Sequence, residues 1–220
     1  SPNLAEVLAI MLVTFIFVGC DFLPSTQLLW INLITDSFPV LALGVEKGVG
    51  DEMKHPPIRA EKNIFSKPSM LSVLFSAAYI TGVTVAVYAI TLAKLGNAEA
   101  TTAAFLTMSF AELFHAFNVR SGNRSAIVGV LSNKILLVTV ALGIAVNVAL
   151  CFSPLAPAFG IAKLPAALWG WVVGASLSVI VFCELYKLIA AIISKAVKNK
   201  PARNPKIKRS LKRKSTAANI

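Results

Sequence analysis

The sequence predicts an all-α membrane protein, a polytopic bundle of six transmembrane helices of which the first is truncated. Of its 220 residues, 56% are hydrophobic and only 14% are charged, whereas a soluble domain is about half apolar and about a quarter charged. The apolar residues stand in long runs, most of them able to cross a bilayer core of about 30 Å. The basic residues gather in connections on one side of those runs. These observations exclude an ordinary soluble domain.

Six apolar runs define the expected helices in chain order. They cover residues 4–20, 22–45, 69–93, 101–119, 135–153 and 164–185. The first run is short, and it lacks the basic start and small-residue cleavage site of a signal peptide. We therefore expect it to be a helix cut partway along, so that the chain would be the C-terminal part of a longer protein.

The basic residues predict how the bundle is oriented. All but two of the 21 Lys and Arg lie in residues 46–67, 120–134 and 187–214. By the positive-inside rule, these loops and the C-terminus are cytoplasmic. We expect residues 1–195 to form the transmembrane domain and residues 196–220 a disordered basic tail. Despite the net charge of +11, this distribution favours anionic lipid over nucleic acid as the partner of the tail.

Three of the expected helices carry a deep acidic residue with polar neighbours at helical spacing. The stripes are Asn3 and Glu6; Asn32, Thr35 and Asp36; and Glu112, His115 and Asn118. Ionisable groups inside a membrane span are costly, and they normally face the protein interior or a water-filled path. Carboxylate, amide and hydroxyl oxygens are ligands that calcium prefers. The stripes therefore predict a site for a hard divalent cation, and manganese would suit these oxygens too.

Two other polar features bear on this site. Pro39 lies three residues after Asp36 and removes a backbone donor opposite the carbonyl of Thr35, so we expect a helix break beside Asp36. Freed carbonyls at membrane depth are tolerated where they line a cavity or bind an ion. Asn147 stands alone in an apolar run, and we interpret it as an interhelical packing residue. His115 is open to two interpretations, packing or support of Glu112 from behind.

Several stretches resemble one family of transporters. Gln27-Leu-Leu-Trp-Ile-Asn-Leu-Ile-Thr-Asp36, followed by Pro39 and Ala42-Leu-Gly44, resembles the sixth transmembrane helix of P-type calcium ATPases. Asp51-Glu-Met-Lys-His-Pro-Pro57 resembles the cytoplasmic loop after it. Ser1-Pro-Asn-Leu-Ala-Glu6 is similar to the middle of the fifth helix in reticulum-type pumps and their bacterial relatives, and Ala-Glu-Leu-Phe-His-Ala-Phe-Asn118 to part of the eighth. The resemblance covers residues 1–195, as helices five to ten.

The resemblance also implies a set of ligands. One calcium site would be formed by Asn3, Glu6, Thr35, Asp36 and Glu112. Asn32 and Asp36 would contribute to a second site, completed by a fourth-helix segment outside this chain, so that Asp36 would bridge both. The acid at Glu6 favours the reticulum-like arrangement over the plasma-membrane type. At the position of His115 the family more often has an amide.

The expected function is that of the ion-binding transmembrane part of an ATP-driven calcium pump, a P-type translocase that exchanges Ca2+ for protons. ATP and Mg2+ would act only through domains outside this chain, which are its expected partners together with the lipid bilayer. No catalytic residue is expected in the chain itself. In a bacterium the membrane would be the plasma membrane. From the residues alone two alternatives stay open, a secondary cation/proton antiporter and a non-transporting scaffold whose polar stripes only pack helices.

Overall fold

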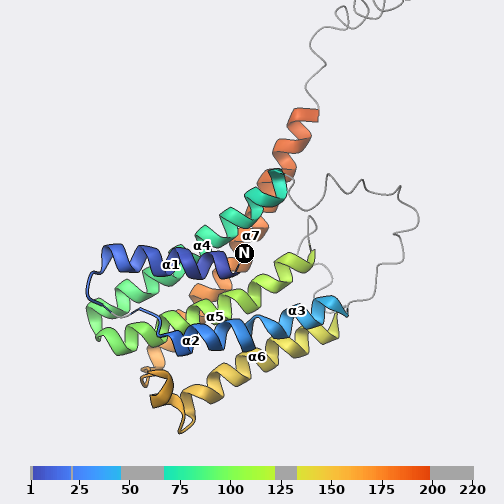
Figure 1. The fold of residues 1–220 in the computed structure, drawn as a ribbon. Coiled ribbons are helices and arrows are strands. Elements are labelled where there is room, and N and C mark those ends of the chain that lie inside the picture. The colour runs from blue at the N-terminus through green and yellow to red at the C-terminus, as the bar shows by residue number, and fades with distance from the viewer. Residues whose placement is uncertain (1, 21, 46–66, 122–132, 199–220) are drawn as a thin grey trace, which may run out of the picture. The chain divides into compact units, whose positions relative to one another are not determined.

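The computed structural model describes residues 2–20, 22–45, 67–121 and 133–198, and every regular element in this part of the chain is a helix (Figure 1). The elements are α1 (Pro2–Ile16), α2 (Ser25–Trp30), the π-helix η1 (Ile31–Thr35), α3 (Ser37–Gly44), α4 (Lys67–Lys94), α5 (Asn97–Ser121), α6 (Lys134–Phe152), the 3-10 helix η5 (Ala156–Phe159) and α7 (Ala166–Lys198). The all-α prediction is confirmed. Contacts divide the chain into two units, Ser1–Glu184 and Leu185–Ile220, and the bundle belongs to the first.

Four segments are long and apolar enough to cross a membrane. They are Ser25–Gly44, which joins α2, η1 and α3, and Met70–Lys94, Lys134–Phe152 and Ala166–Ile192. α1 is apolar but has only 15 residues. α5 is long enough, at 25 residues, but its Thr, Ser, Glu and His side chains make it less apolar than those four. The predicted basic loops and the tail fall mostly on residues 46–66, 122–132 and 199–220, outside the described part of the chain.

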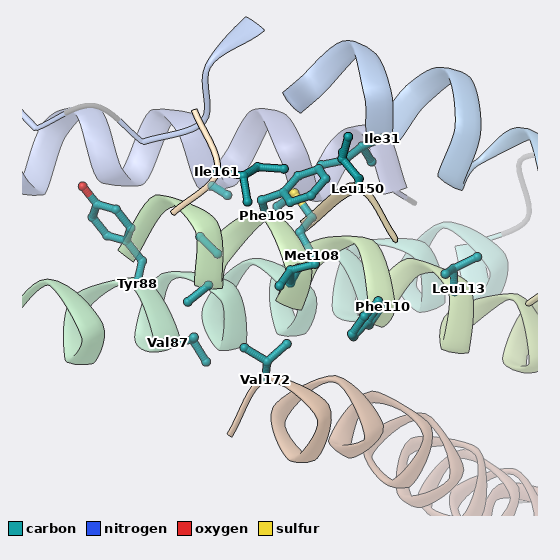
Figure 2. Packing of buried hydrophobic residues seen from close by; sticks show 14 of the residues in the cluster. Ile31, Val87, Tyr88, Phe105, Met108, Phe110, Leu113, Leu150, Ile161 and Val172 are labelled. Carbon is teal, nitrogen blue, oxygen red and sulfur yellow. The ribbon is translucent and has the colours of Figure 1, made fainter. Parts of the chain in front are cut away.

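α5 is the central helix of the first unit. Nearly every side chain between Ala100 and Asn118 is buried, because α4, α6 and the α2–η1–α3 segment all pack against it. α7 contacts it as well, since the Ser176 hydroxyl donates a hydrogen bond to the Thr107 carbonyl (3.1 Å). Figure 2 shows Phe105, Met108 and other apolar side chains of α5 directed towards these neighbours. A polar side chain of α5 between Ala100 and Asn118 is therefore enclosed by protein.

At one end of the bundle, hydrogen bonds and a ring contact join segments that are far apart in sequence. The Gln27 side-chain amide donates to the Phe159 carbonyl (2.9 Å), and the Ala162 backbone N–H donates to the Thr102 hydroxyl (2.8 Å). The ring of Phe22 meets Tyr88 of α4 edge to face at 5.1 Å. The two hydrogen bonds tie η5 and its flanking residues to α2 and α5, and the ring contact ties Phe22 to α4.

α6 buries a single stripe of side chains. Leu136, Val140, Gly143, Asn147 and Leu150 are its buried residues, spaced three or four apart as on one helical face. At Gly143 the absence of a side chain permits close approach, because a Cβ atom there would lie 2.8 Å from Leu113 Cδ2 of α5. The rest of α6 is partly or fully exposed within this chain.

Candidate cation-binding site

Glu6 and Asn32 come together where α1 meets the α2–η1–α3 segment. Glu6 is only 5% exposed, and the Asn32 amide donates to both of its carboxylate oxygens, at 3.1 and 3.3 Å. The same nitrogen also donates to the Leu28 carbonyl (3.0 Å). Because the nitrogen of the amide faces Glu6, its carbonyl oxygen faces away from the carboxylate and retains its acceptor capacity.

The helical hydrogen-bond pattern changes beside Asp36. Residues Ile31–Thr35 form a π-helix, and the Asp36 N–H donates to the Ile31 carbonyl, five residues back, at 3.0 Å. Pro39 has no N–H to donate to the Thr35 carbonyl. π-helical turns in proteins are frequent at functional sites. Here the irregular turn ends at Asp36, a half-buried acid.

Thr35 is held from α6. Its side chain is fully buried, and the Asn147 amide donates to its hydroxyl at 3.4 Å. Asn147 also accepts a hydrogen bond from the Trp30 indole N–H (3.3 Å). From the sequence alone, Asn147 is expected to be an interhelical packing residue. The structure does show interhelical hydrogen bonds, but one of them reaches a predicted ligand.

Glu112 is the most isolated of the acidic groups. It is 3% exposed, and neither carboxylate oxygen has a hydrogen-bond partner among the described residues. The carboxylates of Asp36 and Glu6 are close enough to interact with it electrostatically. A buried carboxylate without a partner is strongly unfavourable in a low-dielectric interior, so this side chain requires a proton or a cation. That requirement fits a ligand for a hard metal ion.

The remaining predicted residues lie on α1 and α5. His115 and Asn118 are buried on α5, at 6% and 4% exposure. His115 Nδ1 lies 3.8 Å from Cys183 Sγ of α7, which in turn lies 3.7 Å from the Ser76 hydroxyl of α4. Asn3 is exposed on the first turn of α1. The structure thus brings Glu6 and Asn32 into contact and links Thr35 to α6, while Asn3 is exposed.

Acidic and imidazole groups alone do not complete a metal site here. Among the described residues, no three His, Cys, Asp or Glu side chains form a group that could hold a metal ion. A hard cation such as calcium takes six to eight oxygens and readily uses amide, hydroxyl and backbone oxygens. Asn32, Thr35 and the carbonyls of the irregular turn are donors of this kind, so the donor chemistry fits a hard cation.

Comparisons with known proteins agree with this chemistry. A family model described as "Cation transporting ATPase, C-terminus" matches residues 21–189. The chain is 30% identical to calcium-transporting ATPase 1 of Bacillus cereus over 206 residues, 86% of this chain and 23% of that protein. It is 31% identical to calcium-transporting ATPase 1 of Lactococcus lactis (89% and 22%) and 30% identical to calcium-transporting ATPase type 2C member 2 of Rattus norvegicus (79% and 19%).

The chain spans about a fifth of the length of these curated relatives, and what it matches is their C-terminal, membrane-embedded region. The match includes both the irregular α2–η1–α3 segment and the buried acid of α5. The chain is therefore an integral membrane protein that belongs to the cation-transporting ATPase family, and it corresponds to the C-terminal region of that family's members.

Proposed function

We propose that this chain is the ion-binding transmembrane part of an ATP-driven calcium pump. The observation that carries the proposal is Glu112, a carboxylate buried on the central helix with no hydrogen-bond partner among the described residues. In a family whose relatives are named calcium-transporting ATPases, a bound divalent cation supplies the missing partner. The family match favours such a pump over a secondary antiporter.

In this proposal the cation is held by oxygens from three helical segments. The ligands of one site are Asn3, Glu6, Thr35, Asp36 and Glu112, while Asn32 and Asp36 contribute to a second site. Glu6 and Asn32 already contact one another, so cation entry would exchange a hydrogen bond for coordination. Asn3 is exposed in this chain, and it would join the site through a small rotation of the first turn of α1. The exposed side of Asn32 would face a segment outside this chain.

The proposed topology has six spans, equivalent to helices five to ten of the pump, with the basic loops and the tail (residues 196–220) in the cytoplasm and the tail against anionic lipid. ATP and Mg2+ act through other domains of the pump. When those domains alter the site, Glu6, Asp36 and Glu112 lose the cation. Protons then neutralise these carboxylates, because a charged carboxylate without a partner is strongly unfavourable in a low-dielectric interior. Calcium–proton exchange follows from that requirement.

The test is the calcium dependence of phosphorylation by ATP in the whole pump. Asp36→Asn and Glu112→Gln each remove a charged ligand and preserve size, and we expect each to raise the half-saturating calcium concentration by about tenfold or more, a change of about 1.4 kcal/mol or more in binding. Glu99→Gln is the matched control, because Glu99 lies in the first turn of the same helix, about 20 Å from Glu112 along the axis.

Unchanged calcium dependence in the Asp36→Asn pump would remove Asp36 from the site, and the same result for Glu112→Gln would contradict the proposal as a whole. Repeating the titration with manganese measures the selectivity between the two cations. If these variants change the half-saturating concentration of manganese but not that of calcium, the site is assigned to manganese.

A further inference from the structure

We propose that Asn147 of α6 is a positioning residue for the cation site, and that it acts by fixing the hydroxyl of Thr35. This inference rests on the proposed function and extends it to a helix that carries no acidic residue. Asn147 is completely buried, and all its described hydrogen bonds connect α6 to itself or to the segment around the irregular turn.

The neighbours of Asn147 determine which way its amide points. The indole N–H of Trp30, 3.3 Å from Oδ1, is only a donor, so it must face the amide oxygen. The backbone carbonyl of Gly143, 2.8 Å from Nδ2, is only an acceptor, so it must face the amide nitrogen. In the reversed orientation, the amide nitrogen would face the Trp30 N–H and the amide oxygen would face the Gly143 carbonyl, so neither hydrogen bond could form. An N–H group is therefore directed at the Thr35 hydroxyl, 3.4 Å away.

This N–H determines which lone pair of the Thr35 hydroxyl oxygen is left for another partner. A helical threonine often donates its hydroxyl proton to the carbonyl four residues back, which here is that of Ile31. In the π-turn, the Ile31 carbonyl already accepts the Asp36 N–H (3.0 Å). With one lone pair of Oγ1 occupied by Asn147, the hydroxyl retains one lone pair for a cation and directs its proton away from Asn147. A ligand held in this way needs little reorganisation when the ion arrives.

Asn147 is itself supported from two sides. Trp30 packs edge to face on Phe159 of η5, with ring centroids 5.3 Å apart. On the other side, Gly143 brings the backbone of α6 against Leu113 of α5. The amide therefore joins a fixed aromatic pair to a closely packed helix pair, and it has little freedom to move away from Thr35.

The test compares four whole pumps by the calcium dependence of phosphorylation by ATP: wild type, Asn147→Leu, Thr35→Val and the double variant. We expect Asn147→Leu to raise the half-saturating calcium concentration by about threefold to tenfold, the range of a single hydrogen bond between membrane helices. In the Thr35→Val background the same change should have little further effect, because the hydroxyl on which Asn147 acts is absent.

The matched control is Ser176→Ala, which removes another fully buried interhelical hydrogen bond, from Ser176 to the Thr107 carbonyl, and which should leave calcium affinity unchanged. If the Asn147→Leu pump does not accumulate in the membrane, Trp30→Phe serves instead. It preserves the aromatic packing and removes the donor that fixes the amide. We expect a smaller shift in the same direction, again absent in the Thr35→Val background.

Two outcomes would overturn the inference: unchanged calcium half-saturation in Asn147→Leu, or losses that simply add in the double variant, as a purely structural role requires. Either outcome leaves the proposed function standing if Glu112→Gln still raises the half-saturating calcium concentration. If Glu112→Gln behaves like wild type, the proposed function itself fails.

Discussion

α5 and α6 differ in a way that reverses the usual relation between hydropathy and burial. α6 is the most apolar of the four candidate spans, yet it buries only one stripe of side chains. α5 is not apolar enough to be one of those spans, yet it is buried along most of its length. A lipid-facing helix must be apolar, whereas a helix covered by other helices can carry polar groups. Low hydropathy within a membrane bundle therefore indicates a helix that is covered by protein, and the proposed site includes a residue of that helix.

The same contrast separates the roles of the polar residues. On α5, Glu112 is enclosed by neighbouring helices and has the chemistry of an ion ligand. On α6, the buried Asn147 stands on an otherwise apolar stripe and reaches the site only through Thr35. In the proposed site, one helix supplies a charged ligand, and the other holds a neutral one in place.

The largest expected effect concerns insertion of the isolated segments into a membrane. An acidic side chain near the middle of a span adds about 3 kcal/mol to the apparent free energy of insertion. We expect residues 134–152 to insert fully in a reporter protein and residues 97–121 to insert poorly. Glu112→Leu should restore insertion of the second segment. The fraction of inserted reporter measures the difference.

Leu142→Glu is the reciprocal change, because Leu142 is an exposed residue near the middle of α6, and it should lower insertion of that segment by a similar free energy. Equal insertion of the two unaltered segments would contradict this difference between α5 and α6. It would mean that α5 can enter the membrane without packing against its neighbours.

A smaller effect is expected where the two helices touch. Gly143→Ala would place a Cβ atom 2.8 Å from Leu113 Cδ2, and Leu113 is itself fully buried. We expect overpacking to lower the free energy of unfolding of the whole pump by about 1–3 kcal/mol, measured as a lower thermal midpoint. Leu113→Ala alone leaves a cavity, so it should cost less stability in the Gly143→Ala background than in the wild type. A Gly143→Ala pump of wild-type stability would mean that the helices can separate freely at this contact.

The smallest expected effect is a gain in stability on α5. The Thr107 hydroxyl is buried without a hydrogen-bond partner among the described residues, so Thr107→Val should raise the free energy of unfolding by about 1 kcal/mol. Thr102→Val is the control, because its hydroxyl accepts from the Ala162 N–H and donates to the Ala98 carbonyl, and it should destabilise the pump. A destabilised Thr107→Val pump would show that α5 needs this hydroxyl.

The positions of the helices could be predicted because apolar runs have a length set by the membrane. The run expected at residues 135–153 is the helix Lys134–Phe152. The run expected at residues 164–185 begins two residues later and continues as helix to Lys198. The end of an apolar run marks where a chain leaves the hydrocarbon, but good helix formers such as Lys, Ala and Leu extend the helix beyond it.

Which residues of different helices contact one another could not be predicted from the sequence. Periodicity placed Thr35 and Asp36 on one face, but nothing in a single sequence matches Asn147 to Thr35, because the two are 112 positions apart. The only available signal was that Asn147 is a lone amide in an apolar run. Likewise, spacing linked His115 to Glu112, whereas the structure places its Nδ1 beside Cys183 of α7. The six-residue ligand set itself stays a prediction.

Because it contains a π-turn, the α2–η1–α3 segment depends on its exact number of residues. A π-turn holds one residue more than an α-turn, so a deletion within Ile31–Thr35 would let the turn close as ordinary α-helix. Everything before the deletion would then rotate by about 100° relative to everything after it. Trp30 and Asp36 could no longer keep their present neighbours at the same time. During evolution this stretch should thus accept an exchange of its exposed Leu33 far more readily than the loss of any single residue.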